Sequence, residues 1–138
     1  MIDPILREEL RRDEGVKLRP YVDTTGHVTI GCGRNLTDVG ISLEEAELLL
    51  ENDMRRVDAA LVEAMPWVET LDPVRKRVVQ NMCFNLGLSG LMGFRVMLHH
   101  LRAGDYDGAA NAMADSKWTE QVGRRAQRLI VMMRTGQV

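Results

Sequence analysis

Residues that favour β-structure are confined to one short stretch of this chain, residues 16–36. Val22 and Val28 flank the run Thr24-Thr25-Gly26, which is typical of a tight turn between two strands. Elsewhere the apolar residues recur with the spacing of helices. The chain can therefore build only one small sheet, and we expect an α+β fold in which helices predominate.

Helix start signals divide the remainder of the chain. Asp3-Pro4 and Asp72-Pro73 each combine an N-cap residue with a proline at the first helical position, and Ser42 with Glu45 forms a capping box. Glycines mark the expected helix ends. The expected helices are, in chain order, residues 4–13, 42–63, 73–87, a helix from Ser89 or Gly90 to about 103, and two or three short helices within 106–134 with a break at Gly123.

These elements predict a single domain of two lobes. The small lobe holds the hairpin over about residues 15–41, and the long helix at 42–63 joins it to a helical lobe. That helical lobe is expected to comprise about residues 64–138 together with the first helix at 4–13. A chain of 138 residues, 45% of them hydrophobic, is long enough to bury such a core. A cleft between two lobes is a common place for substrate to bind.

The net charge of -2 conceals an asymmetry between the two halves of the chain. Residues 1–63 hold 14 acidic and 8 basic side chains, whereas residues 64–138 hold 6 acidic and 10 basic ones. The basic excess has two interpretations. It can be an ordinary solvated surface, or it can bind a polyanion, either nucleic acid or a cell-wall polymer. Its members near the C-terminal end are Lys117, Arg124, Arg125, Arg128 and Arg134.

Metal, disulfide and membrane chemistry are not indicated. Cys32 and Cys83 lie far apart in the chain and have no metal-like spacing with the three histidines, so we expect free thiols and no metal site at these residues. No apolar run reaches 18 residues, and the charges within residues 3–12 exclude the core of a signal peptide. We therefore expect the protein to be made and kept in the cytoplasm.

Two carboxylates are candidate catalytic groups. Glu14 is expected at the C-terminal end of the first helix, directly before Gly15, where the negative end of the macrodipole disfavours a further negative charge. Asp23 follows at the hairpin turn, where bonding to its own backbone is an equally good role. A carboxyl at a helix end and another on an adjoining hairpin can flank a cleft, which is the arrangement glycoside hydrolysis requires. One must donate a proton while the other stays ionised.

The run from Asp13 to Gly33 resembles a known family. Asp13-Glu14-Gly15, then Tyr21-x-Asp23-Thr24-x-Gly26 and Thr29-Ile30-Gly31-x-Gly33, match the T-even phage lysozyme family, glycoside hydrolase family 24, in residue type and spacing. This resemblance implies a mostly helical lysozyme-like fold that hydrolyses the β-1,4 bond between N-acetylmuramic acid and N-acetylglucosamine in bacterial peptidoglycan, without a metal or a cofactor. It covers nearly the whole chain, including Asp53, Asn81-Met82-x-Phe84, Gly87, Gly90, Gly93-Phe94, Trp118, Arg125-Ala126-x-Arg128 and Arg134-Thr135-Gly136.

The resemblance also implies roles for single residues. Glu14 would be the general acid, Asp23 the base or electrostatic partner, and Thr29 the hydroxyl that places the attacking water. A separation of about 6.5–9.5 Å between the two carboxyls leaves room for that water, and we expect inversion at the anomeric carbon. Arg125 matches an arginine beside the catalytic glutamate.

Other matched positions concern the substrate cleft, the core and an ion pair. Phe84 and Asn85 match residues that line the family's substrate cleft, although a core position for Phe84 remains open. Trp118 is expected in the core. The connection near Leu36–Ile41 is shorter than in the best-known members of the family, so the resemblance does not assign the substrate subsites. Arg34 stands where the family has a histidine facing the aspartate matched by Asp53, so we expect an Arg34–Asp53 ion pair.

The expected role is that of an endolysin that lyses a bacterial host and acts as a monomer. A holin-type membrane permeabiliser would release it from the host cytoplasm to the wall. One alternative is a lytic transglycosylase, which needs a single acid and would leave Asp23 and Thr29 without a purpose. Another is a binding module, either a catalytically dead wall-binding domain or a nucleic-acid binder. The retained carboxylates argue against a catalytically dead domain. The acidic net charge argues against a nucleic-acid binder, so we expect no nucleic-acid partner.

Overall fold

The computed structural model describes all residues from 1 to 138 and confirms a mostly helical α+β fold. The chain forms two compact units, unit 1 (Met1–Leu49) and unit 2 (Leu50–Val138). None of the helices combines the length and apolar character that crossing a membrane requires. The assignment of the first helix to the helical lobe stays a prediction.

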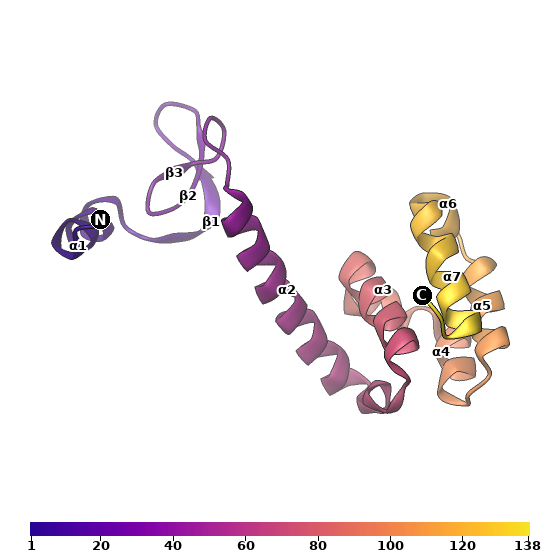
Figure 1. The fold of residues 1–138 in the computed structure, drawn as a ribbon. Coiled ribbons are helices and arrows are strands. Elements are labelled where there is room, and N and C mark those ends of the chain that lie inside the picture. The colour runs from indigo at the N-terminus through magenta and orange to yellow at the C-terminus, as the bar shows by residue number, and fades with distance from the viewer. The chain divides into compact units, whose positions relative to one another are not determined.

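Unit 1 begins with helix α1 (Pro4–Glu14) and continues into a three-stranded antiparallel sheet (Figure 1). Asp3 caps α1 through its side chain, which accepts hydrogen bonds from the amides of Ile5 and Leu6, as the Asp3-Pro4 signal predicted. The strands are β1 (Lys17–Val22), β2 (Val28–Gly31) and β3 (Arg34–Asn35), in that order across the sheet. The predicted hairpin is therefore confirmed, and β3 adds a third strand to it.

Helix α2 (Leu43–Ala64) begins in unit 1 and continues into unit 2. Its first turn carries the predicted capping box, because the Glu45 amide donates to Ser42 Oγ at 3.1 Å and the Ser42 amide donates to Glu45 Oε1 at 2.9 Å. The two bonds satisfy amides that would otherwise lack a partner at the helix start. The predicted span of 42–63 agrees with the observed helix.

Unit 2 packs its remaining helices around one apolar core. Trp118 is only 3% exposed, donates its indole N–H to Asn85 Oδ1 at 3.0 Å and meets the Phe94 ring edge-on, which confirms its expected core position. The largest fully buried side chains include Leu61, Met82, Leu91, Met97, Leu101, Met113, Leu129 and Met133. The elements are η1 (Pro66–Thr70), α3 (Pro73–Met92), α4 (Arg95–Arg102), α5 (Tyr106–Ala114), α6 (Trp118–Val122) and α7 (Arg124–Thr135).

One helix prediction in unit 2 is wrong in part. Gly87 interrupts α3 at φ 76°, as expected, but the single helix predicted from Ser89 or Gly90 to about 103 is divided again after Met92. The Gly93 amide bonds back to the carbonyls of Ser89 and Gly90, which closes the first piece. Phe94 then packs against Trp118 before α4 begins. The second break coincides with Gly93, a helix-ending residue type that the predicted single helix ran through, and the Phe94 ring packs on Trp118 directly beside it.

Candidate active site

Glu14 is the last residue of α1, and its side chain is exposed. Gly15 follows at φ 72° and ends the helix. The carboxylate lies against the turn between β2 and β3, where a β-carbon built on Gly33 would stand 3.1 Å from Glu14 Oε2. Gly33 also has a φ of +81°, so the backbone conformation and the closeness of Glu14 both favour glycine there. The structure thus places a carboxylate beside a tight glycine turn.

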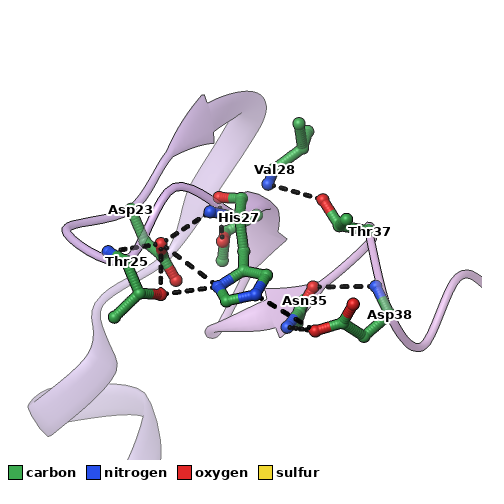
Figure 2. A network of polar contacts seen from close by, with 8 residues as sticks. Asp23, Thr25, His27, Val28, Asn35, Thr37 and Asp38 are labelled. Carbon is green, nitrogen blue, oxygen red and sulfur yellow. Dashed lines mark hydrogen bonds and ion pairs between the residues drawn. The ribbon is translucent and has the colours of Figure 1, made fainter.

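Asp23 lies half-buried at the start of the turn between β1 and β2 (Figure 2). Its Oδ1 accepts three hydrogen bonds, from the His27 amide at 2.9 Å, the Thr25 hydroxyl at 2.8 Å and the Thr25 amide at 2.9 Å. The His27 amide and then the Thr25 hydroxyl are the main reasons that the pKa of Asp23 is lowered from its ordinary value. Its Oδ2 has no hydrogen-bond partner. The backbone-bonding role therefore occupies one oxygen and leaves an ionised carboxylate with the other oxygen free.

His27 was not singled out by the sequence, yet its ring lies among the polar groups around Asp23 (Figure 2). Nδ1 is 2.6 Å from the Thr25 hydroxyl and 3.7 Å from Asp23 Oδ1, while Nε2 is 3.2 Å from Asp38 Oδ2. Asn35 holds Asp38 by two hydrogen bonds of 3.0 Å, one from its side-chain amide and one to its side-chain oxygen. The ring thus connects the Asp23 turn with the loop that follows β3.

Thr29 is the one buried polar side chain of the protein, at 4% exposure. It lies on the central strand β2, opposite Tyr21 on β1 and Asn35 on β3. Its hydroxyl donates to the His27 carbonyl at 3.0 Å, which leaves the hydroxyl lone pairs to accept from another donor. A role in placing water stays a prediction for this residue.

The predicted Arg34–Asp53 ion pair is wrong. Arg34 Nη1 donates to Glu45 Oε1 at 2.8 Å and to the Gly40 carbonyl at 3.1 Å, whereas Asp53 pairs with Arg56 at 2.8 Å. The short loop after β3 brings Arg34 to the first turn of α2, where Glu45 already serves the capping box. The Arg34 hydrogen bond, and after it the Ser42 amide, lowers the pKa of Glu45 from 4.5 to about 2.

The three remaining candidates belong to unit 2. Phe84 is 42% exposed, so a core position for it is wrong. It lines an open hollow of about 370 Å³ together with Asn81 and Arg125. Arg125 is fixed there by donating from Nε to Asn81 Oδ1 at 2.8 Å. Asn85 instead accepts from the Trp118 indole, and its match to a cleft-lining position stays a prediction.

In chemical terms, unit 1 carries a carboxylate whose pKa is lowered by the hydrogen bonds of its turn, a second carboxylate at a helix end and a buried hydroxyl. No cluster of three or more His, Cys, Asp or Glu side chains is placed to hold a metal ion. The cysteines are free, Cys32 exposed and Cys83 buried. General acid–base chemistry with two carboxylates is what these groups can perform.

Comparison with known proteins gives consistent matches. The family profile described as phage lysozyme matches residues 11–134. "Probable T4-type lysozyme 1" of Dictyostelium discoideum is 30% identical, over 95% of this chain and 94% of that protein. "SAR-endolysin" of Escherichia phage Mu is 30% identical, over 86% of this chain and 68% of its own. "Pre-baseplate central spike protein Gp5" of Enterobacteria phage T4 is 31% identical over 95% of this chain, which spans only 28% of the spike protein.

Proposed function

The chain belongs to the phage lysozyme family, and we propose that it cleaves the β-1,4 bond between N-acetylmuramic acid and N-acetylglucosamine with Glu14 and Asp23. It is a glycoside hydrolase of the lysozyme type, which acts on bacterial peptidoglycan. The observation that carries the catalytic assignment is the bonding of Asp23, whose Oδ1 is held by three donors while Oδ2 is free. Such a carboxylate stays charged and oriented while one of its oxygens remains available for reaction.

The reaction that fits these groups is a single displacement by water. Glu14 gives its proton to the glycosidic oxygen as the bond from that oxygen to the anomeric carbon breaks. A water molecule bonds to the anomeric carbon from the opposite face, and Asp23 takes the proton that this water loses. The Thr29 hydroxyl accepts a hydrogen bond from the water and places it. The product carries an inverted anomeric carbon, because the water attacks opposite the leaving oxygen.

Paired substitutions test the assignment on purified peptidoglycan. Glu14→Gln and Asp23→Asn keep the shape of each side chain and remove the acid or the base, so each is expected to abolish release of reducing ends. Glu8→Gln is the matched control, because Glu8 is an exposed α1 carboxylate paired only with Arg11. Full activity of either catalytic variant would overturn the assignment. An anhydro sugar in place of a reducing end would identify a lytic transglycosylase.

The wider role we propose is that of a monomeric endolysin that lyses a bacterial host. The names of two relatives, from Escherichia phage Mu and Salmonella phage P22, support it because both are called endolysins. A holin-type permeabiliser would release the enzyme from the host cytoplasm. Expression in bacteria is then expected to cause lysis only when the inner membrane is opened. Lysis without such opening would contradict the dependence on a permeabiliser.

A further inference from the structure

The His27 ring lies between two carboxylates and makes a different contact with each of its nitrogens (Figure 2). Nδ1 contacts the Thr25 hydroxyl at 2.6 Å, and that same hydroxyl lies 2.8 Å from Asp23 Oδ1. Nε2 lies 3.2 Å from Asp38 Oδ2. The Thr25 hydroxyl is therefore shared between the ring and the carboxylate that we assign to catalysis.

A hydroxyl carries one proton, so Thr25 can donate to Asp23 or to His27 but not to both. When the ring is an imidazolium, Nδ1–H donates to Thr25 and the Thr25 hydroxyl donates to Asp23. When the ring is neutral, the Asp38 carboxylate beside Nε2 favours the tautomer with its proton on Nε2. Nδ1 is then an acceptor, and the Thr25 hydroxyl turns to it and away from Asp23.

We propose that His27 and Thr25 are positioning residues for Asp23. When His27 gives up its proton, Asp23 loses the hydrogen bond from the Thr25 hydroxyl and the positive charge of the neighbouring imidazolium. Asp23 becomes the stronger base in that state, while the His27 and Thr25 amides still hold its orientation. This inference rests on the proposed catalytic role of Asp23. It adds the protonation state of His27 to those of the two catalytic carboxylates as a factor that sets the rate.

The groups that face the ring come from two segments of unit 1. The turn between β1 and β2 contributes Asp23 and the Thr25 hydroxyl, and the loop after β3 contributes Asp38, which Asn35 holds in place. Both charged neighbours are carboxylates, so each attracts the imidazolium. A pH series from about 5 to 8 spans the range in which histidine side chains in general change their charge, so the test uses that range.

The first test is the turnover number of the full-length enzyme across that pH range on a soluble peptidoglycan fragment. The ratio of the wild-type kcat to the kcat of His27→Gln is expected to rise about two- to fivefold from pH 5 to 8. A change of this size corresponds to the interaction of two exposed charges, and KM is expected to stay unchanged. Thr25→Val is expected to reduce this rise, and Thr25→Ser to restore it. His99→Gln is the matched control, because His99 is an exposed histidine of α4.

Two results would overturn the inference. One is a ratio of wild type to His27→Gln that stays constant over pH, and the other is a Thr25→Val variant that keeps the full rise. Asp23→Asn separates these failures from failure of the proposed function. If Asp23→Asn is inactive and the ratio is constant, only the role of His27 is wrong. If Asp23→Asn is fully active, the catalytic assignment fails and the inference fails with it.

The tautomer of His27 gives a second test that does not depend on activity. Nitrogen-15 chemical shifts distinguish a protonated ring nitrogen from an unprotonated one, and His27→Gln identifies which of the three histidine signals belongs to His27. Above the titration, the proton is expected on Nε2 with Nδ1 bare. A neutral ring protonated on Nδ1 would contradict the inference, because the Thr25 hydroxyl would then stay with Asp23.

Discussion

Several residues of unit 1 each have two roles. Asp23 closes its turn with one oxygen and leaves the other free, and Glu45 caps α2 while pairing with Arg34. Gly33 has a left-handed φ and approaches the Glu14 carboxylate. Substitutions at such positions have two effects, so a matched control is needed to separate the effect on stability from the effect on activity.

Gly33→Ala is expected to lower activity by up to about tenfold, because the added methyl group would displace the Glu14 carboxylate by a few tenths of an ångström. The matched control is Gly31→Ala, whose φ of +70° imposes similar backbone strain but whose β-carbon would meet no atom within 4 Å. Rates on peptidoglycan and urea denaturation are measured for both variants. Equal losses of activity at equal stability would show that contact with Glu14 is unimportant.

The stability of the protein is expected to depend on Glu45 at low pH. Its pKa is about 2 in the folded protein against an ordinary value of 4.5, because of Arg34 first and the Ser42 amide second. A lowered folded-state pKa stabilises the fold above the unfolded value and loses that effect as the pH falls through the folded value. Between pH 4.5 and 2 the free energy of unfolding should therefore fall more in wild type than in Glu45→Gln. Glu44→Gln is the control, and an equal fall in wild type and Glu45→Gln would contradict the prediction.

At the scale of elements, helix starts could be predicted from the sequence and helix contacts could not. Asp3-Pro4, Asp72-Pro73 and the box of Ser42 with Glu45 act within one turn, so the sequence is sufficient to locate them. The partner of Arg34 depends on the course of the loop after β3, and α2 carries seven acidic residues among which the sequence does not select. The His27 ring likewise gains its role from Asp38, which a separate loop brings to it.

Arg75 joins α3 to the end of α7. Its guanidinium donates to the carbonyls of Met133 at 2.7 Å and Arg134 at 3.0 Å, and lies 3.5 Å from the centre of the Tyr106 ring. These bonds satisfy carbonyls that the last turn of a helix leaves without partners. Met133 and Arg134 follow Arg75 in the sequence by 58 and 59 positions, so no local signal predicts these bonds.

Arg75→Ala is expected to lower the free energy of unfolding by about 2–4 kcal/mol, since it removes charge-assisted hydrogen bonds and leaves partly buried carbonyls unpaired. Urea denaturation measures the loss, and faster hydrogen exchange at the end of α7 locates it. Arg95→Ala, at an exposed position of α4, should change stability by no more than about 0.5 kcal/mol. A loss for Arg75→Ala as small as that of the control would show that the contact contributes nothing to stability.

For the whole molecule, the candidate catalytic residues Glu14, Asp23 and Thr29 all lie in unit 1, within a short stretch of sequence. This is why a local motif was sufficient to select them. Arg125 and Phe84 lie together in unit 2 around a hollow, and their part in substrate binding stays a prediction. Phe84 also shows the limit of residue type as a guide, because a phenylalanine in an apolar helix is exposed here.

The most direct test of the central claim is the anomeric form of the product in the first minutes of hydrolysis. Nuclear magnetic resonance of wild type acting on a soluble β-linked peptidoglycan fragment is expected to show the α-anomer first, before mutarotation, with no signal from Glu14→Gln. That result requires water to attack opposite a leaving group protonated by Glu14. An initial β-anomer, or a full rate for Glu14→Gln, would contradict the account.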